Sequence, residues 1–215
     1  MLMQQEFQRI VIDIQYLPCI EYFLHILQAK EVVFENSENY LRHTYRNRCK
    51  ILTADKVLEL SVPVKHDGKK LYTEVEIDYT QKWLQVHQRA IVSSYRKAPF
   101  FEFYWPYFEE IYSKKHRTLF EMNYDFLTLC LKFFQIEKKI SFTNSYIKEY
   151  EGVFDLRNRI IPKKNCLESA KLDRITYKQV FGRNFVTNMS IIDLLFCEGN
   201  NAVNVMKLQR EAQGI

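Results

Sequence analysis

The chain has 215 residues, with 16 phenylalanines and 14 tyrosines but only 5 glycines, and a formal net charge of +5 at pH 7. Hydrophobic residues at 47% and charged residues at 27% are proportions of a globular chain that buries a real core, and they exclude large-scale disorder. The charge is mild, and basic residues alternate with acidic ones outside one segment, which argues against a nucleic-acid-binding protein.

The glycines and cysteines exclude several further classes of site. The glycines, at positions 68, 152, 182, 199 and 214, form no phosphate-binding loop and no esterase elbow. The five cysteines are widely spaced without a C-x-x-C pair, so we expect free thiols, no metal site and no cofactor. Residues 1–9 lack the apolar stretch of a signal peptide, and no run reaches the ~18 apolar residues of a membrane span. We therefore expect a cytoplasmic protein.

The first 35 residues predict a β-α-β unit. Residues 9–14 are rich in β-branched residues and predict a buried strand. A turn follows at 15–18, since Pro18 excludes helical geometry from the residue before it. Apolar residues at helical spacing then predict a helix over 19–29, and residues 30–35 predict a second strand.

Residues 42–51 are the most basic stretch, and we expect them to be extended. One face of such a strand carries Arg42, Arg46, Arg48 and Lys50, and the other carries His43, Tyr45, Asn47, Cys49 and Ile51. Neighbours on one face lie roughly 7 Å apart, so Arg46 and Arg48 are spaced to hold two oxygens of a diphosphate or a carboxylate. The alternative is a solvated edge strand whose charges oppose aggregation.

The middle of the chain changes from strands to helices. Residues 57–64 and 71–77 alternate around the turn signal at 66–69, which predicts a hairpin. Helical periodicity follows over 81–98, 100–114 and 119–134, with Pro106 as a kink or break in the second helix. Residues 141–156 are expected to form a loop with short structured pieces. Residues 190–198 and 201–210 are expected to form helices on either side of Gly199.

These elements predict an α+β fold in which a mixed β-sheet from the N-terminal half is packed by a helical C-terminal half. Residues 1–140 are expected to form the core, and residues 141–215 a C-terminal extension packed on the same domain. The tripeptide Arg-Asn-Arg occurs at 46–48 and again at 157–159. If the two segments converge, Arg157 and Arg159 join the first basic segment in one pocket; the alternative is two unrelated surface patches.

Several sequence blocks occur together in an order typical of one protein family. They are Gln15-Tyr16-Leu17-Pro18 with Glu21-Tyr22-Phe23, Thr44-Tyr45-Arg46-Asn47-Arg48-Cys49-Lys50-Ile51, Leu60-Ser61-Val62-Pro63-Val64, and Trp83-Leu84-Gln85-Val86-His87 leading to Tyr95-Arg96-Lys97-Ala98-Pro99-Phe100-Phe101. In these blocks, and in 155–160 and 190–196, the chain resembles the WbqC-like family, in particular its longer Bacteroidetes-type branch. The resemblance implies a role in surface polysaccharide or O-antigen biosynthesis, with a nucleotide-sugar or glycan-related substrate.

Three residues are candidates for catalysis. His87 lies one helical turn after Trp83, and a histidine suits proton transfer near neutral pH; the alternative is a buried helix histidine beside an aromatic ring. His43 is a second candidate base. Cys49 is a candidate nucleophile whose thiolate Arg48 and Lys50 would favour, against the alternative of a small core residue.

The remaining candidates concern binding. The expected substrate-binding residues are Arg46, Asn47, Arg48, Tyr16, Trp83, Tyr95, Arg157 and Arg159, with core packing as the alternative for the aromatic ones. Glu102, Glu109 and Glu110 offer a carboxylate pair, although charged helix positions are usually solvated. Asn123, polar among aromatics, either reaches a ligand or bonds to a neighbouring segment.

Together these residues favour a protein that binds an anionic sugar-linked intermediate, with group transfer as the reaction if it is an enzyme. The rival hypothesis is a non-catalytic binding or scaffold protein of a glycan-assembly complex. The expected partner is an anionic small molecule rather than nucleic acid. The sequence leaves open whether the protein forms a homo-oligomer.

Overall fold

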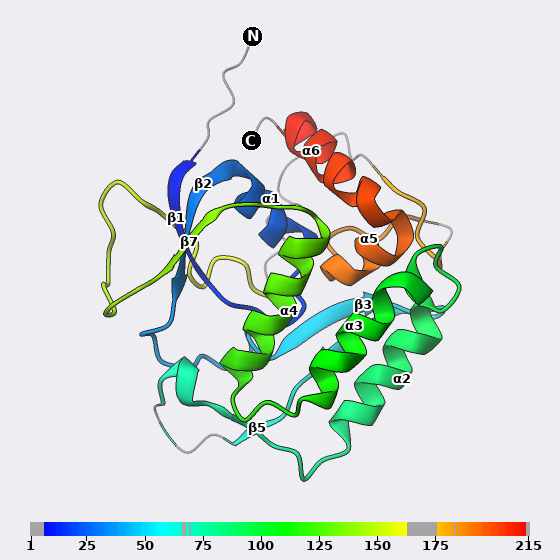
Figure 1. Ribbon diagram of the computed structural model, residues 1–215, viewed down its shortest axis with the longest axis horizontal. Coiled ribbons are helices and arrows are strands. Elements are labelled where there is room, and N and C mark those ends of the chain that lie inside the picture. Colours follow the sequence, from blue (N-terminus) through cyan, green and yellow to red (C-terminus); the bar gives the residue numbers. More distant parts are fainter. Residues whose placement is uncertain (1–6, 66–67, 69, 163–175, 183, 214–215) are drawn as a thin grey trace.

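The computed structural model describes residues 7–65, 68, 70–162, 176–182 and 184–213. Its main sheet has four strands in the order β7-β2-β1-β8, and every neighbouring pair is parallel. Figure 1 labels three of these strands, β7, β2 and β1. The strands are β1 (Phe7–Asp13), β2 (Ala29–Glu35), β7 (Lys139–Phe142) and β8 (Phe154–Asp155). Two of them therefore come from beyond residue 138.

The predicted β-α-β unit is confirmed. Helix α1 (Ile20–Gln28) begins two residues after Pro18 and leads directly into β2, which pairs with β1 from Phe7↔Ala29 to Asp13↔Glu35. Ile10, Ile12 and Phe34 are fully buried, as expected for β-branched and aromatic residues in a parallel sheet. The turn between β1 and α1 contains Leu17 at φ 40°, a left-handed conformation that is rare for a bulky residue.

Two short antiparallel pairs lie outside this sheet. Strand β3 (Arg48–Leu52) pairs with β4 (Val57–Ser61), and β5 (Val64–Lys65) pairs with β6 (Glu76–Ile77). The α+β class is confirmed, but parallel and antiparallel ladders belong to separate sheets rather than to one mixed sheet. The expected strand over 71–77 is mostly wrong, because a 3-10 turn, η1 (Tyr72–Glu74), occupies its first half.

The prediction that residues 42–51 are extended is correct only from Arg48 onward. Residues 42–47 form turns, with His43 at φ 61° and the Thr44 hydroxyl donating to the Leu41 carbonyl at 2.9 Å. Arg46 is therefore not on a strand face with Arg48. Residues 66, 67 and 69 of the expected hairpin turn lie outside the described residues.

The three predicted central helices are confirmed as α2 (Trp83–Tyr95), α3 (Phe101–Ser113) and α4 (Leu119–Phe133). Figure 1 shows α2 and α3 side by side, with α4 on the other side of α3. Pro106 lies inside α3, which continues through it without a break. Helix α4 begins with a capping box, in which Thr118 and Glu121 bond to each other's backbone N–H.

The C-terminal helices are α5 (Ile191–Glu198) and α6 (Ala202–Gln213), joined by the 3-10 turn η3 (Gly199–Asn201). Helix α5 is buried from Ile191 to Cys197 and contacts both α1 and α3. Gly199 has φ 54°, and a Cβ there would lie 2.7 Å from the Phe100 ring, so both conformation and space require glycine. Within the described residues, no helix is long and apolar enough to cross a membrane.

Candidate functional site

Charged side chains gather where the parallel strands end. Strand β1 ends at Asp13, β2 at Glu35 and β8 at Asp155, and the carboxyl ends of parallel strands meet at one edge of the sheet. In open sheets of this kind, ligands usually bind beyond that edge. The turn of residues 42–47 and the segment from Leu156 to Pro162 reach this edge, as the following contacts show.

Arg46 is the centre of a buried network of charges. Its side chain is fully buried, and its guanidinium donates to Glu38 Oε2 at 2.6 Å and to Asn158 Oδ1 at 3.0 Å. Its Nε lies 4.0 Å from Asp13 Oδ2, and the group sits 5.4 Å from the centre of the Tyr72 ring. Arg46 therefore balances the carboxylates of this edge and does not face open solvent.

Asn123 supports the same network from α4. Its Nδ2 lies 2.6 Å from the Arg46 carbonyl oxygen and 2.7 Å from the Tyr72 hydroxyl. The Tyr72 hydroxyl in turn donates to the Ile14 carbonyl at 2.9 Å. The polar helix residue among aromatics thus ties the basic turn to the end of β1.

Arg157 forms a second set of charged contacts. It donates to Glu35 Oε2 at 2.9 Å and to Asp155 Oδ2 at 2.6 Å, and its guanidinium lies 5.1 Å and 4.8 Å from the ring centres of Tyr146 and Tyr150. Burial by itself would raise the pKa of Asp155, but hydrogen bonds from Arg157 outweigh it and the pKa is lowered. The same carboxyl raises the pKa of Arg157.

The two Arg-Asn-Arg segments do converge. Asn158, at φ 57°, accepts from Arg46 and donates to Glu38 Oε1 at 2.9 Å, and the Lys50 ammonium bonds the Pro162 carbonyl at 3.0 Å. Carboxylates stand between the two segments, so their meeting point is a neutralised network rather than an open basic pocket. Arg159 is exposed beside Asp155, and Lys163 and Lys164 of the second basic segment lie outside the described residues.

An open basic hollow lies next to this network. It has a volume of about 190 Å³ and is lined by Tyr40, Arg42, His43, Asn47, Arg48 and Val64. Among the described residues, the buried atoms Asn47 Oδ1 and Arg48 Nε have no hydrogen-bond partner. Burial raises the pKa of Tyr40, while the charges of Arg48, Arg46 and Arg42 act in the opposite direction, which places three cations around this phenol.

Within the hollow, Arg48 forms only one, partly exposed ion pair among the described residues. Its Nη1 lies 2.7 Å from Glu59 Oε1, in a pair whose side chains are 19% and 39% exposed. His43 is exposed at its left-handed turn position, and strained backbone of this kind gathers at binding sites. The hollow is thus a cationic recess of the size of one phosphate or carboxylate group.

His87 lies in the interior and does not line the hollow. It is 3% exposed, and its Nδ1 is 2.9 Å from the Tyr16 hydroxyl, which is itself 2.5 Å from the Tyr112 hydroxyl. The Trp83 ring packs edge-on at 5.0 Å. Burial lowers the pKa of His87 to about 4, although a hydrogen bond with the Ser61 backbone opposes the shift.

Cys49 and Tyr95 are also in the interior. Cys49 is 1% exposed, and burial, assisted by the charge of Glu59, raises the pKa of its thiol. Tyr95 is fully buried, and its hydroxyl accepts a hydrogen bond from the Leu52 N–H at 3.1 Å. The other described cysteines are free and buried as well, whereas Cys166 lies outside the described residues.

Ten of the predicted site residues fall into three groups, and the exposed Arg159 belongs to none of them. His43, Asn47 and Arg48 line the hollow, Arg46 and Arg157 hold the charge network, and Tyr16, Trp83, His87, Cys49 and Tyr95 lie in the core. Among the described residues, no group of three or more His, Cys, Asp or Glu is placed to hold a metal ion.

The sequence reasoning missed the acidic half of the network and a buried carboxyl in α5. Asp13 and Glu35 are 1% exposed, and the available signal was an acidic residue at the end of an apolar strand. Asp193 is fully buried; it accepts from the Tyr177 hydroxyl and, at 2.9 Å, from Gln179 Nε2, and burial raises its pKa. Nothing in the local pattern of 190–196 distinguishes Asp193 from a solvated helix residue.

Comparison with known proteins places these observations in one family. The profile of the WbqC-like protein family matches residues 14–163 and 162–205. The uncharacterized protein Rv1507c of Mycobacterium tuberculosis (strain ATCC 25618 / H37Rv) is 24% identical over 234 residues, covering 94% of this chain and 98% of that protein. No solved structure matches the chain. Since the family profile spans both the sheet and the C-terminal helices, the chain belongs to the WbqC-like protein family.

Proposed function

We propose that this protein binds an anionic, sugar-linked intermediate of surface polysaccharide biosynthesis, with the anionic group in the basic hollow. The observation that carries the proposal is the group Arg42, His43 and Arg48 around one recess, where two lining residues, Asn47 and Arg48, each carry a buried polar atom without a hydrogen-bond partner. Membership of the WbqC-like family supports the polysaccharide context, because members of that family are associated with surface polysaccharide and O-antigen gene clusters.

The size of the hollow limits what it holds. At about 190 Å³ it is smaller than the roughly 300–1,000 Å³ of ordinary small-molecule pockets. It therefore accommodates a phosphate or carboxylate, while a nucleoside or sugar attached to that group would lie along the surface outside. The planar guanidinium of Arg48 suits such an anion, because it donates two parallel hydrogen bonds.

Arg48 is free to change partners. Its present pair with Glu59 is partly exposed, and exposed ion pairs contribute only about 0–1 kcal/mol. Exchange of Glu59 for a dianionic ligand in the hollow therefore costs little.

The positions of the candidate catalytic groups support two candidate functions, a group transferase and a binding protein. His43 lies in the hollow and is within reach of a bound anion, so in a group transferase it would handle the proton. His87 and Cys49 are shielded from solvent and would take part only if ligand binding uncovered them. Their burial favours the second candidate function, a non-catalytic binding protein of a glycan-assembly complex.

Thermal unfolding in the presence of inorganic phosphate, uridine diphosphate and a uridine diphosphate sugar tests the proposal. A ligand at a hundred times its dissociation constant adds about 2.7 kcal/mol of stability, which is a visible shift. Arg48→Ala should weaken binding about tenfold or more, since it removes charged hydrogen bonds.

Arg117→Ala is the matched control, because Arg117 also pairs with a glutamate, Glu76, at 3.1 Å but does not line the hollow. The variants lose the same charge. Equal binding by both variants, or no shift with any of the three ligands, would refute the site.

A further inference from the structure

A second, larger groove lies between α2 and α3, which run side by side in Figure 1. Its volume is about 480 Å³, within the ordinary range for small-molecule sites, and it shares no residue with the hollow at Arg48. Arg89 and Arg96 line it from α2, and Trp105 and Glu109 from α3.

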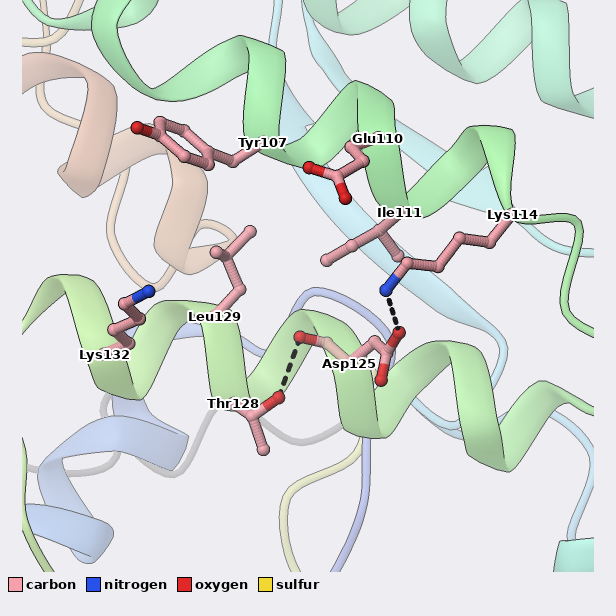
Figure 2. Close-up of a pocket in the computed structure, with 8 residues that line it drawn as sticks. All are labelled: Tyr107, Glu110, Ile111, Lys114, Asp125, Thr128, Leu129 and Lys132. Atoms are coloured by element: carbon pink, nitrogen blue, oxygen red, sulfur yellow. Dashed lines mark hydrogen bonds and ion pairs between the residues drawn. The ribbon is translucent and has the colours of Figure 1, made fainter.

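Within the described part of the chain, no carboxylate neutralises the two arginines of this groove, whereas some of the cations in two other grooves are paired. In the α3–α4 groove of about 420 Å³, the Lys114 ammonium points at Asp125 and pairs with it at 2.9 Å (Figure 2). In a groove at the N-terminal ends of the strands, also of about 420 Å³, Arg9 and Lys139 both pair with Glu31. Within the described part of the chain, neither Arg89 nor Arg96 forms an ion pair.

The two arginines can act on one ligand. They are seven residues apart, which is about 10 Å along the helix axis and nearly the same face. Both side chains are exposed, and Val92 lies between them along the helix. An anionic group placed over Val92 is therefore within reach of two long, flexible guanidinium groups.

The α3 side of the groove carries an aromatic ring and a carboxylate instead of cations. Trp105 is 8% exposed with its ring stacked on Phe101 at 5.6 Å, so a fixed aromatic edge forms the floor beside Val92. Glu109 is exposed on the same wall and forms no ion pair with either arginine in the described structure. A ligand seated here meets cations along α2, an apolar floor, and an acceptor carboxylate along α3.

We propose that the α2–α3 groove binds a sugar phosphate. The phosphate accepts hydrogen bonds from Arg89 and Arg96, which donate as planar forks. The apolar face of the sugar ring packs on Val92 and the edge of Trp105. Its hydroxyls donate to Glu109, and the half-buried Gln88 amide is a further partner. Inorganic phosphate uses only the first of these contacts.

Titration calorimetry with glucose 1-phosphate and inorganic phosphate tests the groove. We expect glucose 1-phosphate to bind more tightly than inorganic phosphate, and Arg96→Ala or Arg89→Ala to weaken it about tenfold or more. Lys97→Ala is the control, because Lys97 is exposed next to Arg96 but does not line the groove. It should bind as the unchanged protein does. Each titration is repeated in an Arg48→Ala background, where phosphate binding in the hollow is weakened, and the effect of Arg96→Ala should persist there.

Each other outcome overturns the proposal. Equal weakening in Lys97→Ala and Arg96→Ala means an effect of net charge, and loss of the Arg96→Ala effect in the Arg48→Ala background means that the ligand sits in the hollow. Equal affinity for phosphate and glucose 1-phosphate removes the role of the sugar. Absence of saturable binding at millimolar concentration refutes the site. Because both arginines are solvent-exposed on α2, their loss leaves the core intact, and circular dichroism checks this.

Discussion

Replacing Arg46 with methionine tests whether this residue holds the fold together rather than a ligand. Methionine keeps a long side chain of similar shape but removes the charge. In the native structure the guanidinium is fully buried and lies 2.6 Å from Glu38, whose side chain is only 12% exposed. The Asp13 side chain, 2% exposed, lies 4.0 Å from its Nε. Arg46→Met therefore leaves two shielded carboxylates facing a thioether.

The expected cost is large. Removal of one partner of a buried ion pair typically costs about 3–5 kcal/mol, because the remaining charge stays buried without compensation. The hydrogen bond to Asn158 Oδ1 at 3.0 Å is lost as well. Since small domains have a total stability of about 5–15 kcal/mol, the variant should be close to unfolding at moderate urea concentration.

Urea denaturation followed by circular dichroism measures the effect. Arg117→Met is the control, because its guanidinium is 73% exposed and its pair with Glu76 is worth about 0–1 kcal/mol. Adding Glu38→Gln to Arg46→Met should recover part of the loss, since it removes one of the stranded charges. A loss below about 1 kcal/mol in Arg46→Met, or one equal to the control, would refute a network that depends on Arg46.

Three further experiments test the roles of the buried residues His87, Cys49 and Thr118. Because burial lowers the pKa of His87 from 6.5 to about 4, the unfolded chain takes up a proton in this window that the folded protein does not. The free energy of unfolding should therefore fall by about 3 kcal/mol as the pH falls from 6.5 to 4. Urea denaturation at several pH values measures this slope, and His87→Gln should flatten it. An unchanged slope in the variant would contradict the lowered pKa of His87. Burial raises the pKa of the Cys49 thiol, so iodoacetamide should label Cys49 only after unfolding, as read by peptide mass spectrometry; rapid labelling of native protein would show an accessible thiolate. Thr118→Ala removes the N-cap of α4 and should cost about 1 kcal/mol in thermal unfolding, whereas a neutral result would mean that the capping box does not stabilise α4.

Local patterns in the sequence determined most of the secondary structure. The β-branched run at residues 9–14 and the helical periodicity at 83–95, 101–113 and 119–133 record directly which faces are buried, because apolar spacing follows the geometry of each element. The resemblance to the WbqC-like family was also visible in the sequence blocks alone, and the family profile confirmed the family. Pro106 misled the prediction slightly, since α3 accommodates it without a break.

Tertiary structure alone decided the role of the basic segment. The alternation of charges at 42–51 reads as a strand, but the Thr44 hydroxyl bonds back to Leu41 and residues 42–47 turn away from the ladder. Whether an arginine faces solvent or a carboxylate depends on which distant segment comes to meet it. For Arg46 that segment is Asn158, 112 residues further along, with Glu38 between them. A sequence shows that a charge exists, but only the folded chain shows whether another charge neutralises it. Glu38 and Asn158 meet Arg46, which is therefore part of the core, whereas Arg48 pairs only with the partly exposed Glu59 and lines the open hollow.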